Sequence, residues 1–393
     1  MSPPQSHVRT STLHGPRPFS ERGRVCLIAL LLALLGAGCA TTAAPVTNPP
    51  IDWRHRIPGS AFFQDELGEW ISPLVQPDFP FEELIYSWHV NKPGDAFRLY
   101  LKVVFSRGDE SEWLYAGFWG APNEFVAGRK VPTFDRGVLD MDWLKLKAKA
   151  TGFQFRVVAV GAKRLSVPPS LMVIATDNHP TAAASRPAAL AKDSGTAARV
   201  LDVPLRRQID SRGTRLIDRC QSAALASAME YFGKSVPLED IVRHTFDPEY
   251  GYPGIWPRVT GAAQEFGFEA GIERFRDWTA VRRALAENKV ILCSMRMKAG
   301  ECQSPPYPSM GNHIVTLCGV TDDGRVVVTD SFLGKSGRGY LCQWRQSDFE
   351  KVWMQTKGGI AMVISPPRGA AVRPVQALPP FPKDRVPSVG DDH

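Results

Sequence analysis

The apolar residues of this chain follow two different periods, and the change between them constrains its fold most strongly. From residue 59 to 178 they alternate in short runs such as Leu84–Val90 and Ala96–Phe105, separated by turn residues such as Lys92-Pro93-Gly94-Asp95. Alternation is the period of a strand that buries one face. We therefore predict an all-β, sandwich-like domain over residues 59–178.

Residues 201–366 instead mix two periods, which predicts an α/β domain. After Cys220, small and apolar residues recur at helical spacing until Gly233. Other segments with helical spacing or cap signals predict helices at 237–243, 259–266 and 278–287. The second of these could start as early as Trp256, and the third follows the N-cap candidate Asp277. Short apolar runs predict strands at 290–297, 313–320, 325–329 and 360–364.

Three other segments are rich in small, polar and proline residues and are expected to connect or flank these domains. Residues 40–58 suit a flexible tether, residues 179–200 suit an interdomain linker, although their alanines allow a weak helix, and residues 367–393 form a polar, proline-rich tail that we expect to be disordered. The chain of 393 residues is thus long enough for two domains plus these segments.

The N-terminal residues 1–39 have the features of an export signal. Arg22 and Arg24 precede an uncharged apolar run, and small residues precede Cys39. The run is short for a bilayer span and has the charged region, apolar region and small-residue site of a secretory signal. These features predict a secretory signal, and an ordinary one that is cut near this position is the alternative to the lipoprotein-type signal described next.

The end of this segment, Leu34-Leu35-Gly36-Ala37-Gly38-Cys39, resembles the lipobox of bacterial lipoproteins. The resemblance implies that Cys39 becomes the lipidated first residue of the mature chain and attaches it to a membrane. It also implies sorting to the outer membrane, facing the periplasm or the surface, because Ala40 follows the cysteine where inner-membrane lipoproteins have aspartate.

The charge pattern excludes one class of partner. The formal net charge of +7 arises largely from the leader and from scattered arginines, and no basic run is interleaved with aromatics, so no nucleic acid partner is expected. The first domain also holds Trp88, Trp113, Trp119 and Trp143. Tryptophans in a sandwich usually belong to its core, but a glycan contact by this domain is the alternative.

Cys220 is the cysteine that stands out among the seven. Cys26 and Cys39 belong to the leader, and the absence of a CxxC pair argues against a zinc site, so no metal and no cofactor are expected. Cys293 and Cys318 lie in apolar strand patterns, whereas Cys302 and Cys342 lie in polar settings where they could pair. Cys220 instead opens a helix, whose N-terminal N–H groups favour an anion such as a thiolate. A core cysteine is the alternative.

A base and its orienting group are predicted in one hairpin. His313 begins a predicted strand, Asp323-Gly324 is a strong two-residue turn signal, and Asp330 ends the returning strand. Because the two strands are antiparallel, His313 and Asp330 are expected to be neighbours. A carboxylate on one ring nitrogen would leave the other nitrogen to face a thiol, the arrangement that activates a cysteine nucleophile.

These residues carry a family resemblance. The order of Gln, Cys, His and Asp resembles papain-type cysteine peptidases, and the segments VPLRRQ, CQSAALASAMEYFG, PGIWP, GNHIVTLCGV and VVVTDS resemble family 39 peptidase-like domains related to bacteriocin-processing peptidases. The upstream segments SWHV, LYAGFWG and VLDMDWL resemble the N-terminal region of exported bacterial members. The likeness implies an α+β papain-like fold for residues 201–366 and a peptide or protein substrate.

By this resemblance Cys220 is the nucleophile, His313 the general base and acid, Asp330 its orienting group, and Gln208 the side-chain donor to the oxyanion. The family usually has Gly-Pro or Ser-Pro after the cysteine, where this chain has Gln221-Ser222, so Gln221 competes with Gln208 as the donor. Two other functions remain open: a binding lipoprotein of the cell envelope whose papain-like domain is inactive, and an acyltransferase that uses the same residues.

Overall fold

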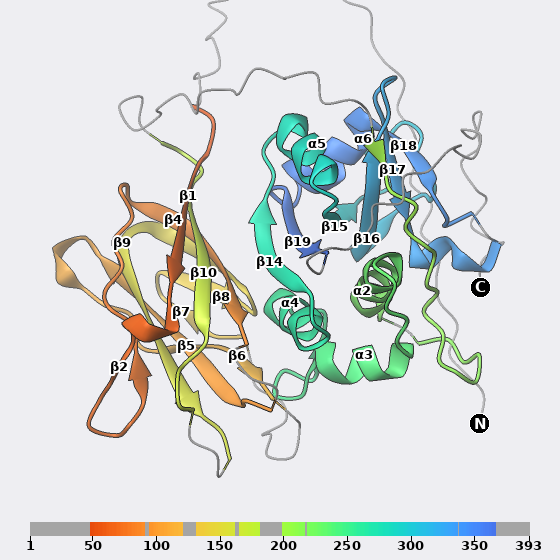
Figure 1. Cartoon of the computed structure of the whole chain (residues 1–393). Coiled ribbons are helices and arrows are strands. Elements are labelled where there is room, and N and C mark those ends of the chain that lie inside the picture. The colour runs from red at the N-terminus through yellow and green to blue at the C-terminus, as the bar shows by residue number, and fades with distance from the viewer. Residues whose placement is uncertain are drawn as a thin grey trace, which may run out of the picture. The chain divides into compact units, whose positions relative to one another are not determined.

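The computed structural model describes residues 48–90, 94–120, 131–161, 165–180, 199–216, 218–336 and 338–366 (Figure 1). The chain from Asn48 onward clusters into one compact unit, which contains an all-β domain followed by an α+β domain. The predicted export signal and the predicted tail lie outside the described residues. Within the described part, no helix combines the length and the apolar character needed to cross a membrane.

In its described part, the first domain is one antiparallel sheet of ten strands. The strands are β1 (Ile51–Ile57), β2 (Phe63–Gln64), β3 (Trp70–Ile71), β4 (Phe81–His89), β5 (Phe97–Phe105), β6 (Leu114–Trp119), β7 (Thr133–Phe134), β8 (Gly137–Asp140), β9 (Trp143–Ala159) and β10 (Ser170–Asp177). Two short 3₁₀ turns lie in connections between strands: η2 (Gly59–Ala61) between β1 and β2, and η3 (Ser106–Gly108) between β5 and β6.

The long strand β9 makes this sheet sandwich-like. Its first half pairs with β4 and β8, and its second half pairs with β5 and β3. The two halves then pack through their rings. Phe81 on β4 meets Phe153 edge to face at 5.9 Å between centroids, and Tyr86 meets Phe155 at 5.5 Å. The predicted all-β, sandwich-like domain is therefore observed.

The prediction of a tether over residues 40–58 is wrong for its last part. Ile51–Ile57 form β1, which pairs with β10 along its whole length at the edge of the sheet. The charged residues of this edge strand obscured the alternation, but Ile57 is buried and the ring of Trp53 lies 6.5 Å from that of Phe153. The predicted linker is likewise shorter at its end, because Arg199–Val200 form β11; its residues 181–198 lie outside the described part.

The second domain consists of helices packed on an antiparallel sheet. The strand order of this sheet is β14, β19, β15, β16, β17 and β18, and β11 pairs with β16. Its helices are α2 (Cys220–Tyr231), α3 (Leu238–Thr245), α4 (Trp256–Glu265), α5 (Trp278–Ala286) and α6 (Gln346–Glu350), with a 3₁₀ turn η5 (Ser331–Ser336) and a π-helical turn η6 (Lys351–Gln355). Its strands are β11 (Arg199–Val200), β14 (Glu269–Arg274), β15 (Val290–Met297), β16 (Met310–Val320), β17 (Arg325–Thr329), β18 (Cys342–Arg345) and β19 (Ile360–Ser365), and β12 (Phe246–Asp247) pairs separately with β13 (Tyr252–Pro253).

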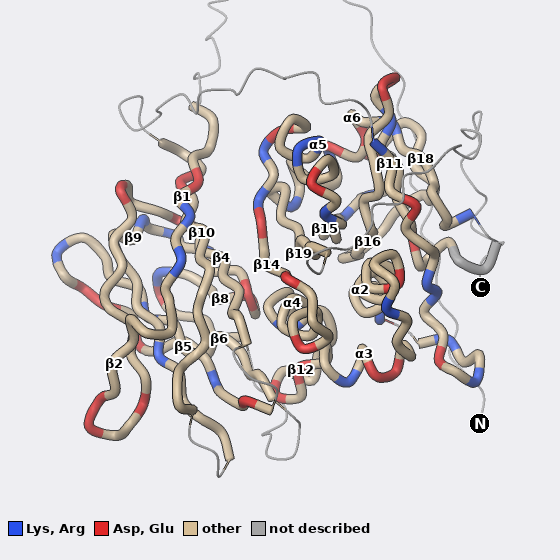
Figure 2. The backbone as a smooth tube through the Cα atoms, viewed as in Figure 1, with Lys and Arg blue, Asp and Glu red and all other residues tan. Residues whose placement is uncertain are grey.

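The ends of the helices follow from identifiable residues. Gly233 after α2, Gly267 after α4 and Asn288 after α5 all have positive φ. In each case the amide of the next residue bonds back into the last turn at 2.9 or 3.0 Å, which satisfies carbonyls that a helix end leaves open. Asp277 caps α5 by accepting from the amide of Ala280 at 2.8 Å, as predicted. Acidic residues begin α3 and basic residues end it, which suits the helix dipole (Figure 2).

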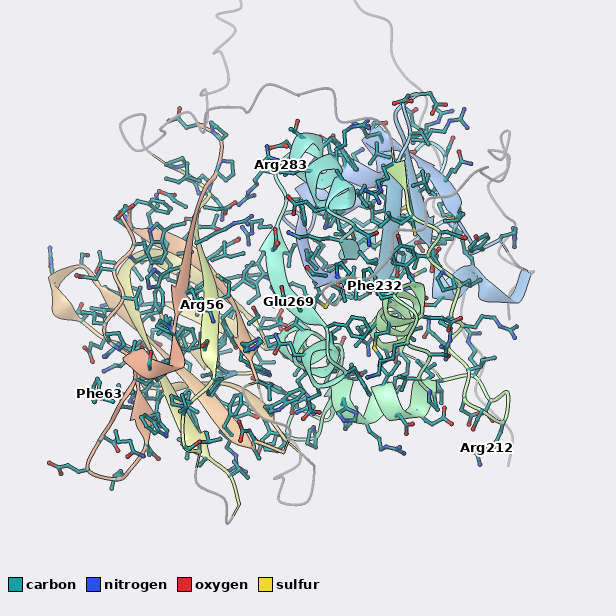
Figure 3. The ribbon with its side chains drawn as sticks, in the orientation of Figure 1. Arg56, Phe63, Arg212, Phe232, Glu269 and Arg283 are labelled. Atoms are coloured by element: carbon teal, nitrogen blue, oxygen red, sulfur yellow. The ribbon has the colours of Figure 1, made fainter. Side chains whose placement is uncertain are left out.

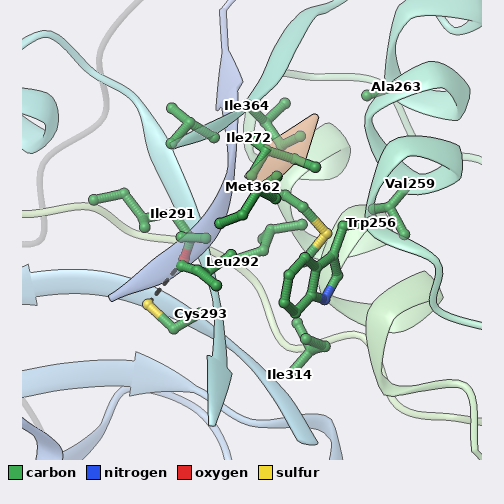
Figure 4. Packing of buried hydrophobic residues seen from close by; sticks show 14 of the residues in the cluster. Trp256, Val259, Ala263, Ile272, Ile291, Leu292, Cys293, Ile314, Met362 and Ile364 are labelled. Atoms are coloured by element: carbon green, nitrogen blue, oxygen red, sulfur yellow. Dashed lines mark hydrogen bonds between the residues drawn. The ribbon is translucent and has the colours of Figure 1, made fainter. Parts of the chain in front are cut away.

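The core of the second domain lies between α4 and the sheet. Trp256, Val259 and Ala263 on α4 face side chains from β14, β15, β16 and β19 (Figure 4). Helix α2 is more enclosed still, since ten of its twelve residues are buried. The predicted helix after Cys220 is therefore confirmed as a central helix, whose small side chains allow close packing on every side.

The two domains meet where α4 lies against β4 and β6. A Cβ atom at Gly261 on α4 would come within 2.8 Å of the Trp119 ring and 2.9 Å of Trp88 Nε1, so glycine is required for this approach. Both tryptophans are buried here, at 1% and 2% exposure. Nearby, the guanidinium of Arg258 donates to the carbonyl oxygen of Phe118 at 2.7 Å. The contact is therefore buried and is supported by the hydrogen bond from Arg258, whereas the Nε1 atoms of Trp88 and Trp119 have no hydrogen-bond partner among the described residues.

A second contact joins β1 to β14. Arg54 donates to the carbonyl oxygen of Arg274 at 2.8 Å and pairs with Glu273 at 3.4 Å. Arg56 and Glu269, labelled in Figure 3, lie on the same two strands. Strand β1, which the sequence did not predict, thus contributes directly to the domain junction.

Gly261→Ala should weaken the domain junction. Its methyl group would overlap two rigid indoles, so the free energy of unfolding should fall by about 1–3 kcal/mol in urea denaturation. Gly271→Ala on β14 is the matched control, because its Cβ would meet nothing nearer than 3.9 Å. Equal stabilities for the two variants would contradict the close packing described here.

Candidate active site

Cys220 is the first residue of α2, and it follows a turn in which one backbone torsion is unfavourable. Asp218 has φ of 55° and Arg219 takes the N-cap position, so the chain turns sharply before the cysteine. The thiol donates to Gln221 Oε1 at 3.4 Å and is partly exposed. The prediction of a cysteine at a helix N-terminus is confirmed.

His313 and Asp330 are in contact, as the hairpin predicts. His313 Nε2 lies 2.8 Å from Asp330 Oδ1, and the side chains are 4% and 0% exposed. Strand β16 begins three residues before His313, at Met310, and Asp330 follows the last residue of β17. The Asp330 carboxylate also accepts from the amide of Phe332 at 2.9 Å, which fixes its position.

Aromatic rings enclose this histidine. Tyr307 meets the imidazole edge to face at 6.5 Å between centroids, and Phe332 does so at 6.0 Å. Burial also raises the pKa of Tyr307, with a further contribution from the charge of Asp330. The imidazole is therefore held in one orientation, with Nε2 on Asp330 and Nδ1 left for another partner.

The charge on His313 is stabilised by its two neighbours. Burial alone lowers the pKa of this imidazole, but the charge and hydrogen bond of Asp330, followed by contributions from Cys220, raise it to about 10. Since the ordinary value is 6.5, the protonated ring stabilises the fold fully below about pH 6.5, and this stabilisation is lost as the pH rises through about 10. At neutral pH the ring is an imidazolium beside the thiol.

Gln208 contacts residues next to Cys220 and Asp330. Its Nε2 donates to Ser331 Oγ at 3.1 Å, and its Oε1 accepts from the amide of Arg219 at 3.1 Å. Gln208 thus joins the residue before Cys220 to the residue after Asp330. It is not among the residues that line the cavity beside the thiol, so its predicted donor role stays a prediction.

Gln221, the competing donor, does line this cavity. Its Nε2 donates to the carbonyl oxygen of Asp218 at 3.3 Å, and its Oε1 faces the Cys220 thiol. The side chain also packs on Gly254, whose ideal Cβ would come within 3.2 Å of it. In this arrangement Gln221 presents an acceptor to the sulfur, which is the wrong polarity for an oxyanion.

A cavity of about 130 Å³ joins Cys220 and His313. One wall is the loop before α4, with Tyr252 and Gly254, and another is the sheet. The opposite wall comes from the first domain, at the hairpin tip between β8 and β9 and at Lys145 further along β9. The carboxylate of Asp142 in that tip accepts from the amide of Trp256 at 2.5 Å.

The sequence analysis missed this hairpin wall. Met141 at the tip has φ of 58°, a conformation that costs a non-glycine residue about 1 kcal/mol or more. Burial and the charge of Asp140 raise the pKa of Asp142 to about 7, although its bond to the Trp256 amide opposes the shift. Nothing local in the sequence Leu139–Trp143 places it beside a cysteine some eighty residues later in the chain.

The other cysteines of the second domain are not bridged. Cys293, Cys302, Cys318 and Cys342 are free thiols, as is Cys220. Burial raises the pKa of Cys293, and it raises that of Cys318 to about 12, which suits the predicted core roles. The alternative that Cys302 pairs with Cys342 is not observed; Cys302 Sγ instead lies 3.7 Å from the carbonyl oxygen of Asp348.

Two family models match the chain. Residues 200–361 match the Peptidase C39-like family, and residues 54–176 match the Peptidase C39 N-terminal domain. No curated protein matches the sequence. The matched ranges coincide with the α+β domain and the all-β domain described above.

Three solved structures are similar to part of this chain. The peptidase domain of Streptococcus ComA, a bi-functional ABC transporter involved in a quorum-sensing pathway, is 18% identical, with a TM-score of 0.30 over 42% of this chain and 98% of that one. A C39-like peptidase from Bacillus anthracis is 14% identical (TM-score 0.34, 44% and 99% covered). A double-glycine-motif protease from an AMS/PCAT transporter, solved with a leader peptide, is 18% identical (TM-score 0.28, 43% and 98% covered).

Asp330→Asn should lower the pKa of His313. Removing the carboxylate leaves burial as the dominant influence, and burial disfavours the imidazolium, so the pKa should fall well below about 10. An NMR titration of the ring resonances measures it. Asp323→Asn, at the exposed turn of the same hairpin, should leave the pKa unchanged. If the pKa of His313 were the same in both variants, Asp330 would not be the group that raises it.

Proposed function

The chain belongs to the Peptidase C39-like family, and on this premise we propose that it is a cysteine peptidase that hydrolyses peptide bonds through Cys220, His313 and Asp330. The observation that supports this most is the placement of the His313 imidazole on the buried carboxylate of Asp330 and in the same cavity as the partly exposed Cys220 thiol. A thiolate paired with an imidazolium is the activated form of a cysteine nucleophile.

The first half of the reaction forms a thioester. The Cys220 sulfur attacks the carbonyl carbon of the scissile bond, and the negative charge moves to the carbonyl oxygen. When the C–N bond breaks, the His313 imidazolium gives its proton to the departing amine. Asp330, bonded to Nε2, holds the ring so that Nδ1 is the nitrogen that exchanges this proton.

The second half restores the enzyme. The neutral His313 ring takes a proton from a water molecule while the water oxygen attacks the thioester carbon. The C–S bond then breaks, releasing a carboxylic acid and the thiolate, and the ring is again an imidazolium. The raised pKa of His313 keeps this resting state protonated throughout the neutral range.

The oxyanion would be stabilised by N–H groups near the start of α2. A helix N-terminus offers amides without helical partners, and Gln208, whose Oε1 accepts from the amide of Arg219, is the side chain that the family resemblance assigns to this role. A donor of this kind contributes on the order of 3 kcal/mol. A Gln208→Ala enzyme with unchanged kcat would remove Gln208 from this role.

The export signal remains part of the proposal. The lipobox-like ending at Cys39 favours a chain that is exported and anchored in the cell envelope by a lipid on this cysteine, with the peptidase outside the cytoplasm. Mass spectrometry of the mature N-terminal peptide tests it. A lipid-bearing Cys39 is expected, and a mature chain that begins elsewhere without lipid would contradict it.

Cys220→Ala and His313→Ala should each abolish peptide hydrolysis. The first removes the nucleophile and the second its proton donor, so turnover of a fluorogenic peptide library should fall by at least about three orders of magnitude. Labelling of Cys220 by a thiol-directed probe should also be lost or slowed. Cys302→Ala is the matched control, because Cys302 is a partly exposed thiol outside the cavity. Wild-type turnover by the Cys220→Ala protein would disprove the proposal.

A further inference from the structure

Lys145 brings a positive charge from the first domain to the active-site cavity. It lies on β9 just beyond the hairpin tip, and its ammonium sits 3.9 Å from the centroid of the Trp143 ring, which also lines the cavity. The residue paired with it on β4 is Glu83, but the Glu83 carboxylate is bound by Arg274 at 2.8 Å. Lys145 is therefore held by an aromatic face and not by a neighbouring carboxylate.

Lys357 brings a second positive charge from the other domain. It lies between η6 and β19 and lines the same cavity, where its Nζ donates to Asn312 Oδ1 at 2.8 Å. Amide oxygen is a neutral acceptor, so the charge is not cancelled. Across the ranges that the structure describes, neither lysine forms an ion pair with a carboxylate.

The surroundings of Lys357 disfavour its charge. Burial lowers the pKa of this amine, Lys145 and Arg296 lower it further, and Asp142 and Asp140 oppose them without reversing the shift. Two ammonium groups that face one partly dehydrated space repel each other, and the nearby carboxylates of Asp140 and Asp142 offset this repulsion only in part. A bound anion between them would remove that repulsion.

The cavity is also lined by the carboxylates of Asp140, Asp142 and Asp218. Asp142 is engaged by the Trp256 amide. Burial, then the charges of Cys220, Asp218, Asp142 and Asp140, raise the pKa of Tyr252. Cations act on Lys357, whose pKa is lowered by Lys145 and Arg296, but none is among the main causes of the shift at Tyr252. The cationic side chains of the cavity are therefore grouped around Lys357.

We propose that Lys145 and Lys357 form a subsite for a carboxylate of the substrate, which makes the β8–β9 hairpin of the first domain a determinant of specificity. This inference rests on the proposed function, because it concerns the substrate of the same cavity. The carboxylate belongs to the peptide beside the scissile bond, either as an acidic side chain or as a free C-terminus.

Alkylation of Cys220 tests the subsite without a known substrate. Iodoacetate and iodoacetamide react alike, since the thiolate sulfur displaces iodide from carbon, but iodoacetate carries a carboxylate. The ratio of their rate constants at Cys220, followed by mass spectrometry of its peptide in the full chain, reports the preference for the anion. The neutral reagent corrects for any change in the thiol itself.

The double variant Lys145→Gln with Lys357→Gln should lower this ratio by about fivefold or more, and each single variant should lower it by about twofold to threefold. Lys147→Gln is the matched control. Lys147 lies on the same strand, is exposed, and does not line the cavity. Thermal melting confirms that each variant is folded.

Two kinds of failure are distinguishable. If wild-type Cys220 reacts with neither reagent, the proposed function fails and the subsite fails with it. If Cys220 reacts readily but the ratio is the same in the wild type, the double variant and the control, the subsite alone is overturned.

Matched peptides identify the source of the carboxylate. Amidated peptides that differ by Glu or Gln at one position test a side chain, and neutral peptides with a free or amidated C-terminus test the terminal group. We expect kcat/KM to favour the carboxylate in one of the two series by at least about fivefold, and the double variant to lose this preference. Equal kcat/KM within both series would overturn the inference.

Discussion

The contact between α4 and the first domain fixes the geometry on which the rest of the structure depends. Gly261 lets the helix backbone approach Trp88 and Trp119 so closely that a methyl group would not fit. Burial of large apolar side chains of this kind contributes about 1.5–3 kcal/mol each. At the start of the same helix, the amide of Trp256 is satisfied by Asp142 of the first domain. Packing and capping thus hold the hairpin tip in place.

The consequence is a cavity beside Cys220 with walls from both domains. The thiol, the imidazole and the carboxylate all come from the second domain, on α2, β16 and the end of β17. The hairpin and Lys145 come from the first. A residue that packs the domain junction therefore also helps to determine where this wall of the cavity lies.

The buried charged side chains of His313 and Arg258 have neighbours that bind them through hydrogen bonds or opposite charge. His313 stays protonated inside an aromatic enclosure because Asp330 and Cys220 outweigh the cost of burial. Arg258 is almost fully buried, and burial lowers its pKa to about 10, with Asp247 opposing the shift. Its guanidinium bonds the carbonyl oxygens of Phe118 and His244. Arg258 joins the domains, whereas the pair of His313 and Asp330 lies at the cavity that contains the Cys220 thiol.

The sequence by itself determined the local elements and the hairpin that joins His313 to Asp330, because cap residues, glycines and a turn signal act within a few residues. It did not reveal β1, whose strand pattern is masked by charged edge residues, and it did not place Gln208, whose contacts with Arg219 and Ser331 depend on two separate loops. Only the tertiary structure decided that Asp142 and Lys145 line the same cavity as Cys220, because that arrangement depends on how α4 packs against β4 and β6, and no short-range pattern encodes such packing.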